Sequence, residues 1–134
     1  MISKNEIANI PLKGNINFRE RNVEKNHTAL LIIDLQKGEF NPEIIKKKPN
    51  EQYMWDRIRD VVIPSGTKLI HACRVNKIEV IYTVIESLTK DGRDSGLDYK
   101  ISGMCVPKGS IDAEVIDELK PLNNEIIIPK TSSS

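Results

Sequence analysis

A charged side chain closes each of two short apolar segments of the sequence. Asp34 directly follows TALLII at 28–33, and Lys130 closes EIIIPK at 125–130. The carboxyl ends of parallel strands meet at one edge of a sheet, and ligands of open α/β sheets bind outside that edge. A carboxylate beside an ammonium group would supply a proton acceptor and a positive charge there, as general acid–base chemistry requires. Both residues are therefore candidate catalytic groups.

Each of these two residues also has an ordinary structural interpretation. An aspartate after a strand often caps a loop or a helix with its side chain. A lysine between strands and loops is usually a solvated surface residue. The two residues together, each at the end of a predicted strand, are more specific than either one alone.

The two cysteines of the sequence are candidate nucleophiles. Cys73 lies four residues after Leu69 on the apolar face of a predicted helix, where free cysteine commonly packs as core. Cys105 lies in GMCVPKG, five residues before Ser110, and we expect a loop or packing role for it. Two cysteines do not make a disulfide framework. The sequence therefore predicts no catalytic cysteine among them.

Three apolar segments, 28–33, 79–85 and 125–128, are predicted to be strands. They are short and rich in β-branched residues, which favours strand over buried helix. Their apolar residues are continuous rather than alternating, a pattern typical of parallel strands that are buried on both faces.

Helical periodicity separates these strands. Apolar residues recur at helical spacing in 52–62 and again in 64–76, where Pro64 suits a first turn. A third helix is predicted over 111–119, with Ser110 as its N-cap. Alternating strands and helices imply right-handed crossovers, and therefore an α/β fold with a parallel sheet in the strand order 3-2-1.

The composition is that of an ordinary globular protein. The net charge is +1, with 39% hydrophobic and 29% charged residues, so no basic field indicates a nucleic-acid or membrane partner. The apolar runs are too short to span a bilayer, and the first residues lack the apolar core of a secretory signal. We therefore expect a cytoplasmic protein.

No cofactor or metal is expected from the sequence. His27 and His71 have no partner at metal-ligand spacing, and no glycine-rich phosphate loop is present.

Several segments resemble the isochorismatase-like (cysteine hydrolase) family. HTALLIIDLQKGEF resembles its first strand and following loop, whose signature is ALLxIDxQ with a Phe soon after. VIPSGTKLIHACRVNKIEVIYTVIE is similar to its first long helix and second strand, and NEIIIPK to its third strand. The stretch from IYTVIESLTKDGRD to PKTSSS resembles the ureidoacrylate amidohydrolase-like branch most closely. The resemblance runs from His27 to Ser134 and covers only the N-terminal part of the family domain.

This resemblance implies a three-layer, Rossmann-like parallel sheet that is truncated before its fourth strand. It also implies that Asp34 is a catalytic base and Lys130 the second of three catalytic residues. The third, a cysteine nucleophile, would lie beyond Ser134, so we expect the isolated chain to be inactive or impaired. By analogy with the branch, Arg93 and Tyr99 contact the substrate. The implied activity is hydrolysis of a C–N bond in a small amide or ureido compound.

The alternative is a catalytically inactive truncated paralogue or fragment that acts as a binding protein. In either case we expect an N-terminal arm at 1–27 and an incomplete hydrolase domain at 28–134. The edge of the strand at 28–33 is apolar and would lack its fourth-strand neighbour. Since unpaired strand edges template pairing with other chains, we expect a homo-oligomer or association through this edge.

Overall fold

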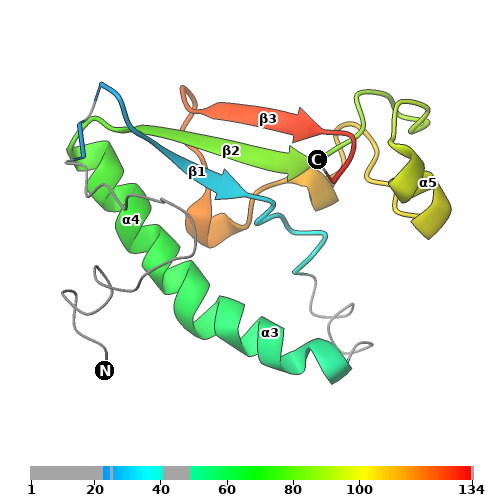
Figure 1. Cartoon of the computed structure of the whole chain (residues 1–134), viewed down its shortest axis with the longest axis horizontal. Helices are drawn as coiled ribbons and strands as arrows, with labels where there is room; N and C mark the ends of the chain where they lie inside the picture. The colour runs from blue at the N-terminus through cyan, green and yellow to red at the C-terminus, as the bar shows by residue number, and fades with distance from the viewer. Residues whose placement is uncertain (1–22, 25, 41–48, 134) are drawn as a thin grey trace, which may run out of the picture.

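A three-stranded parallel sheet forms the centre of the computed structural model, which describes residues 23–24, 26–40 and 49–133 (Figure 1). The strands are β1 (Ala29–Ile33), β2 (Glu79–Ile85) and β3 (Ile126–Lys130). They lie in the order β1-β2-β3, with β2 in the middle. The predicted α/β fold and strand order 3-2-1 are therefore confirmed. The predicted arm at 1–27 lies almost entirely outside the described residues and stays a prediction.

The register of the sheet decides what meets at its carboxyl edge. Ile33 stands opposite Thr83 in the β1–β2 ladder, and Lys130 stands opposite Ile85 in the β2–β3 ladder. The ends of β1 and β3 therefore flank the end of β2, one on each side. The residue after β1, Asp34, arrives at the same edge as Lys130.

The predicted helices at 52–62 and 64–76 form one continuous helical run (Figure 1). It begins with the 3₁₀ turn Pro49–Glu51 and continues through α3 (Gln52–Arg57), the π-helical η2 (Ile58–Val62) and α4 (Ile63–Val75). Pro64 lies in the first turn of α4, as predicted, but no break separates α4 from the helical turns before it. Proline lacks an N–H, and its ring clashes with the carbonyl group four residues back. The wider π turn just before Pro64 relieves that clash, since π-bulges accommodate such interruptions without ending a helix.

The predicted helix at 111–119 is wrong. Two 3₁₀ turns, η3 (Ile111–Ala113) and η4 (Asp117–Leu119), stand there instead. Ser110 does cap the first of them, because its side chain accepts a hydrogen bond from Asp112 N. The backbone between the turns pairs with the chain that follows β1: Lys37 N donates to Glu114 O at 2.8 Å and Ile116 N to Leu35 O at 3.0 Å. A short isolated helix is marginal, so these longer-range hydrogen bonds prevail over local propensity.

A short helix that the sequence did not predict follows β2. α5 (Leu97–Ser102) carries Tyr99 as its buried residue and ends at Gly103, whose φ of 73° is left-handed. Glycine has no Cβ and adopts this conformation without strain.

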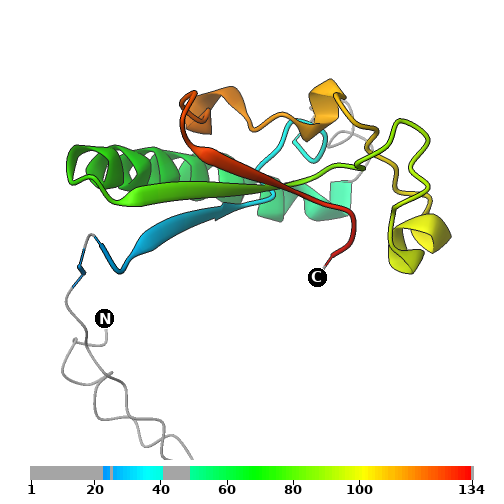
Figure 2. The same ribbon diagram turned by 90° about the horizontal axis from the view of Figure 1, so that it is seen from above.

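The core lies on one face of the sheet, where α4 and the two 3₁₀ turns pack. Figure 2 shows α4 beside the sheet on that side. The buried core side chains alternate along β2 and come from β1, α4 and the 111–119 segment as well: Ile32, Ile70, Val80, Tyr82, Val84, Val115, Ile116 and Leu119. No helix among the described residues is long and apolar enough to cross a membrane.

The opposite face of the sheet is uncovered by the described residues. Leu31 and Ile33 of β1 are 48% and 57% exposed, and Ile126 and Ile128 of β3 are 48% and 45% exposed. The register places these four side chains on one face with Ile81 of β2. The expectation of strands buried on both faces is therefore not met within the part of the chain that the structure describes.

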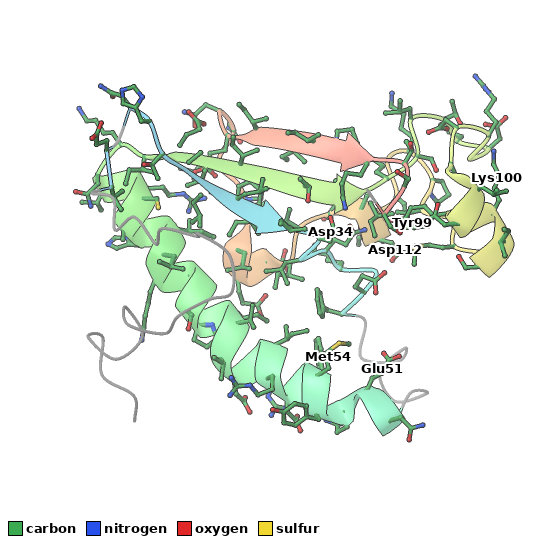
Figure 3. The ribbon with its side chains drawn as sticks, in the orientation of Figure 1. Asp34, Glu51, Met54, Tyr99, Lys100 and Asp112 are labelled. Atoms are coloured by element: carbon green, nitrogen blue, oxygen red, sulfur yellow. The ribbon has the colours of Figure 1, made fainter. Side chains whose placement is uncertain are left out.

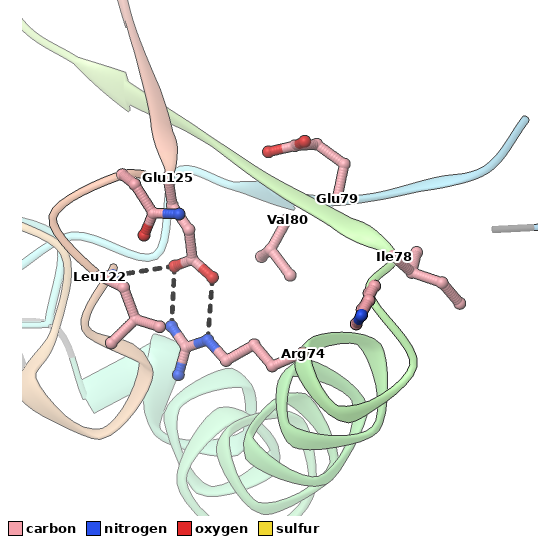
Figure 4. Close-up of a pocket in the computed structure, with 8 residues that line it drawn as sticks. Arg74, Ile78, Glu79, Val80, Leu122 and Glu125 are labelled. Carbon is pink, nitrogen blue, oxygen red and sulfur yellow. Dashed lines mark hydrogen bonds and ion pairs between the residues drawn. The ribbon is translucent and has the colours of Figure 1, made fainter. Parts of the chain in front are cut away.

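An ion pair joins α4 to the residue before β3 at the other end of the sheet (Figure 4). Nε and Nη2 of Arg74 each donate to the Glu125 carboxylate at 2.8 Å, and Leu122 N donates to the same carboxylate at 2.9 Å. Arg74 Nη2 also reaches the hydroxyl of Tyr82 at 3.3 Å. Arg74, Leu122 and Glu125 line a pocket of about 260 Å³. The pair fixes the start of β3 against the helix.

Two titrating groups at this ion pair have shifted pKa values. The hydrogen bonds from Arg74 hold the pKa of Glu125 below its ordinary value of 4.5. Burial raises the pKa of Tyr82 to about 12. A depressed carboxylate pKa contributes stability above the unfolded-state pKa, and that contribution is lost as the pH falls through the folded-state value.

We predict that Glu125→Gln lowers the free energy of unfolding by about 2 kcal/mol at pH 7, the scale of a charged hydrogen-bonded pair. The loss should shrink as the pH falls below 4.5, because the carboxylate then takes up a proton in the unfolded state before it does so in the folded state. Urea denaturation at pH 7 and pH 4 measures both values. Asp60→Asn is the control, because the Arg59–Asp60 pair is more than half exposed and such pairs contribute little. An equal loss of stability at both pH values would contradict a stabilising role for the ionised Glu125 carboxylate.

Candidate functional site

The candidate site begins at the residue where β1 ends. Asp34 has a φ of 53°, in the left-handed region that aspartate and asparagine tolerate better than most residues. Its N–H still continues the ladder by donating to Thr83 O at 3.0 Å. The chain therefore turns away from the sheet at Asp34, and the carboxylate is left at the sheet edge.

Asp34 and Lys130 form an ion pair at this edge. Lys130 Nζ lies 2.7 Å from Oδ2 of Asp34, and Thr83 Oγ1 donates to Oδ1 at 2.9 Å. The two charged side chains are 26% and 20% exposed, so the carboxylate is held by groups of β2 and β3 and still reached by solvent. The prediction that these residues share one side-chain cluster is confirmed, whereas their catalytic role stays a prediction.

The chemistry open to this pair follows from its hydrogen bonds. Each carboxylate oxygen accepts one of the bonds just described and retains capacity for another. A partly exposed carboxylate with fixed orientation can take a proton from a group that approaches from solvent. The ammonium group beside it can balance negative charge that develops nearby.

Thr83 and Gln36 belong to this arrangement, and the sequence predictions did not name them as site residues. Thr83 orients the carboxylate from the neighbouring strand. Gln36 is 1% exposed and bonds the end of β2 through its side chain. A glutamine in the otherwise apolar stretch around Asp34 was a visible signal. Thr83 gave none, because threonine is ordinary in a strand.

Arg93 and Tyr99, the predicted substrate contacts, lie in the segment between β2 and the 3₁₀ turns. Figure 3 shows Tyr99 on α5 and Asp34 at the end of β1. Tyr99 is 6% exposed and packs as core of its segment, while the exposed guanidinium of Arg93 pairs with Asp91 at 3.1 Å. Neither arrangement presents a free group to a substrate in this conformation, and their binding role stays a prediction.

This segment is nonetheless attached to the residues that follow Lys130. Gly96 N donates to Thr131 O at 2.7 Å, and Ser133 Oγ donates to the Asp98 carboxylate at 2.7 Å. Asp98 therefore has its pKa held below the ordinary value, chiefly by that serine hydroxyl. The segment after β2 is thus hydrogen-bonded to residues 131–133, which directly follow Lys130 in the chain.

The two cysteines occupy different surroundings. Cys73 is half-buried and packs against the core, as the helical spacing predicted. Cys105 is exposed, and its Sγ lies so near Gly92 that a Cβ there would approach it to 3.2 Å. Both thiols are free. Among the described residues, no group of three or more His, Cys, Asp or Glu side chains is arranged to hold a metal ion.

The chain matches the model of a known protein family. The family model described as the isochorismatase domain matches residues 28–134, which is most of the chain. The chain belongs to the isochorismatase family. A search of the curated proteins found no match.

Solved structures of this family are similar to the chain in fold. A cysteine hydrolase from Pseudomonas syringae pv. phaseolicola 1448A is 24% identical with a TM-score of 0.61, over 81% of this chain and 48% of that one. An N-carbamoylsarcosine amidase from Thermoplasma acidophilum is 22% identical with a TM-score of 0.52, over 77% and 51%. An isochorismatase family protein from Desulfovibrio vulgaris subsp. vulgaris str. Hildenborough is 20% identical with a TM-score of 0.50, over 77% and 52%. The chain thus spans about half the length of these isochorismatase-family structures.

We predict that Asp34→Gly is more stable than Asp34→Ala by about 1 kcal/mol, because only alanine carries a Cβ into the left-handed conformation. Both variants lose the same two side-chain hydrogen bonds, so the difference isolates the backbone term. Urea denaturation of the two variants measures it.

The matched pair Asp98→Gly and Asp98→Ala serves as the control. Asp98 lies in α5, where alanine is the better helix former, so the order of stability should reverse. The same order at both positions would contradict the assigned strain at Asp34.

Proposed function

We propose that this chain carries two catalytic groups of an isochorismatase-family hydrolase that cleaves a C–N bond in a small amide or ureido substrate. The observation that carries the proposal is the 2.7 Å contact between Lys130 Nζ and Asp34 Oδ2 at the carboxyl edge of the sheet. Such an edge is where ligands bind in open α/β sheets.

In the proposed reaction, Asp34 takes the proton of a thiol nucleophile that is neither Cys73 nor Cys105, the two cysteines of this sequence. The thiolate attacks the substrate carbonyl carbon, and the C–N bond breaks as the proton passes to the leaving nitrogen. Water then hydrolyses the acyl thioester and regenerates the thiol. Lys130 fixes the carboxylate and balances the negative charge that develops during attack.

Two features support the substrate class. The residues from IYTVIESLTKDGRD onward resemble the ureidoacrylate amidohydrolase-like branch. One structural neighbour is an N-carbamoylsarcosine amidase, an enzyme whose name denotes cleavage of a carbamoyl nitrogen bond. In this proposal Arg93 and Tyr99 contact the substrate after the loop that carries them rearranges.

We place this reaction in the cytoplasm. Both cysteines are free thiols, and free thiols persist in reducing compartments. Export to an oxidising compartment would expose Cys105 to oxidation, because it is exposed.

Ammonia release from a panel of small carbamoyl and ureido compounds, measured with the protein expressed from its own gene, tests the proposal. We expect Asp34→Asn and Lys130→Met each to lower kcat by about 10²-fold or more, the scale of a lost acid–base group. Lys68→Met should leave kcat unchanged, because Lys68 is an exposed residue of α4 and lies far from both Asp34 and Lys130 in the sequence.

The cysteine variants separate the possible nucleophiles. Turnover that survives Cys73→Ser and Cys105→Ser but is abolished by a thiol alkylator would support a nucleophile other than the two cysteines of this sequence. Loss of turnover in Cys105→Ser would contradict that part of the proposal. A folded protein that hydrolyses no member of the panel would favour the non-catalytic alternative.

A second proposal concerns association. The uncovered face is contiguous with the outer edge of β1, which pairs with no strand among the described residues, and Leu31 and Ile33 lie there about half exposed. Exposed apolar patches of this kind mark interaction surfaces. We propose that the chain associates through the 28–33 edge, with a second copy of itself as the partner.

We predict that Leu31→Glu shifts the purified protein toward the monomer in light scattering, because a charge on this face cannot be buried without cost. Leu97→Glu is the control, since Leu97 is 73% exposed on α5, away from the edge. The experiment should be run with residues 1–27 present and deleted, because the arm is the competing cover for the edge. A monomer in every case would overturn the proposal.

A further inference from the structure

The side chain of Gln36 takes the place of a missing strand residue. β1 ends at Ile33, whereas β2 continues to Ile85. In the β1–β2 ladder, Thr83 O faces β1 and accepts a hydrogen bond from Asp34 N. Peptide groups alternate in direction along a strand, so the N–H and C=O of Ile85 also face the side that β1 has already left. Without a partner these two groups would be orphaned.

The Gln36 carboxamide pairs with both of them. Its Oε1 accepts Ile85 N at 2.5 Å, and its Nε2 donates to Ile85 O at 3.0 Å. The second hydrogen of Nε2 is donated to Asp112 O at 2.9 Å. A carboxamide carries the same donor and acceptor as a peptide group, so the glutamine side chain extends the ladder beyond the end of β1.

The backbone around Gln36 holds the amide in this position. Gln36 forms a bridge with Val115 in the antiparallel sense, and Gly38 N donates to Asp112 O at 3.0 Å. A Cβ on Gly38 would stand 2.8 Å from the Cβ of Asp112, so the two chains approach closely there. With Gln36 only 1% exposed, its amide has no access to solvent or to a substrate.

These bonds connect Gln36 to the candidate catalytic pair. Ile85 stands opposite Lys130 in the β2–β3 ladder, and Asp34 precedes Gln36 by two residues. Thr83 and Ile85 are successive residues of β2 whose backbone groups face the β1 side, and both bond the chain after β1. Asp34 N donates to Thr83 O, and the Gln36 side chain bonds both backbone groups of Ile85. Together these attachments set where the carboxylate stands relative to the ammonium group.

We propose that Gln36 is a positioning residue that holds the Asp34–Lys130 pair together through Ile85. Its catalytic significance rests on the proposed function, whereas the geometric role does not. Glutamate cannot replace it when ionised, because a carboxylate has no donor for the carbonyl groups of Ile85 and Asp112. Asparagine is one methylene shorter, so its amide falls short of Ile85.

NMR of the ammonium group of Lys130 tests the proposal without any turnover. A lysine ammonium that donates to a carboxylate exchanges its hydrogens slowly enough to be observed, and loss of the signal in Lys130→Met assigns it. We expect Gln36→Met, which matches the shape but bonds none of the three groups, to lose this signal. Leu119→Ala is the matched control: Leu119 is 1% exposed core, so Tm should fall while the signal remains.

A folded Gln36→Met protein that keeps the Lys130 signal would overturn the proposal. Should that variant not fold, hydrogen exchange of the wild-type side-chain amides decides. The chain has two glutamines, and Gln52 is exposed. Gln36 should exchange at least 10-fold more slowly than Gln52, and equal rates would refute the three hydrogen bonds. A normal Lys130 signal in a protein without hydrolase turnover would count against the proposed function alone.

Discussion

The parallel pairing of β2 with both of its neighbours is the constraint on which the rest of the structure depends. Asp34 and Lys130 are 96 residues apart in the sequence, and only this pairing brings them to one edge of the sheet. The register then fixes which residues meet, since a slip of one residue would turn Lys130 to the other face. At the opposite edge, Arg74 and Glu125 fix the residue before β3 against α4. The strand is thus held in register by an ion pair at each end.

Much of this arrangement could be predicted from the sequence because it depends on strong periodicity. Three short β-branched runs indicated the strands, and the side-chain pattern between them indicated a crossover helix. The strand order followed from the handedness of such crossovers. The meeting of Asp34 with Lys130 required only that both close parallel strands of one sheet. These inferences used features that tertiary contacts rarely reverse.

The predictions failed where a single longer-range contact outweighed a local signal. Ser110 and the apolar spacing of 111–119 were good helix signals, yet residues 114–116 pair their backbone with 35–37. Pro64 indicated the first turn of α4 correctly, but it gave no sign that a π turn would join α4 to the helix before it. Gln36 was overlooked as a site residue because its role depends on where β1 stops relative to β2. The pairing of 114–116 with 35–37 and the role of Gln36 cannot be read from periodicity, since each is a property of two segments far apart in the chain.

The sequence separation of the ion pair also has a consequence for folding. Contacts between residues this distant require two successive crossovers to close, and each closure costs chain entropy before any bond repays it. The pair therefore cannot form in a partly folded species in which β3 is still detached. An intermediate that consists of β1, the long helix and β2 would have a complete β1–β2 ladder, with the Asp34 carboxylate bonded to Thr83 but without Lys130. The Asp34–Lys130 ion pair would thus arise only in the last stage of assembly, together with the native register of β3.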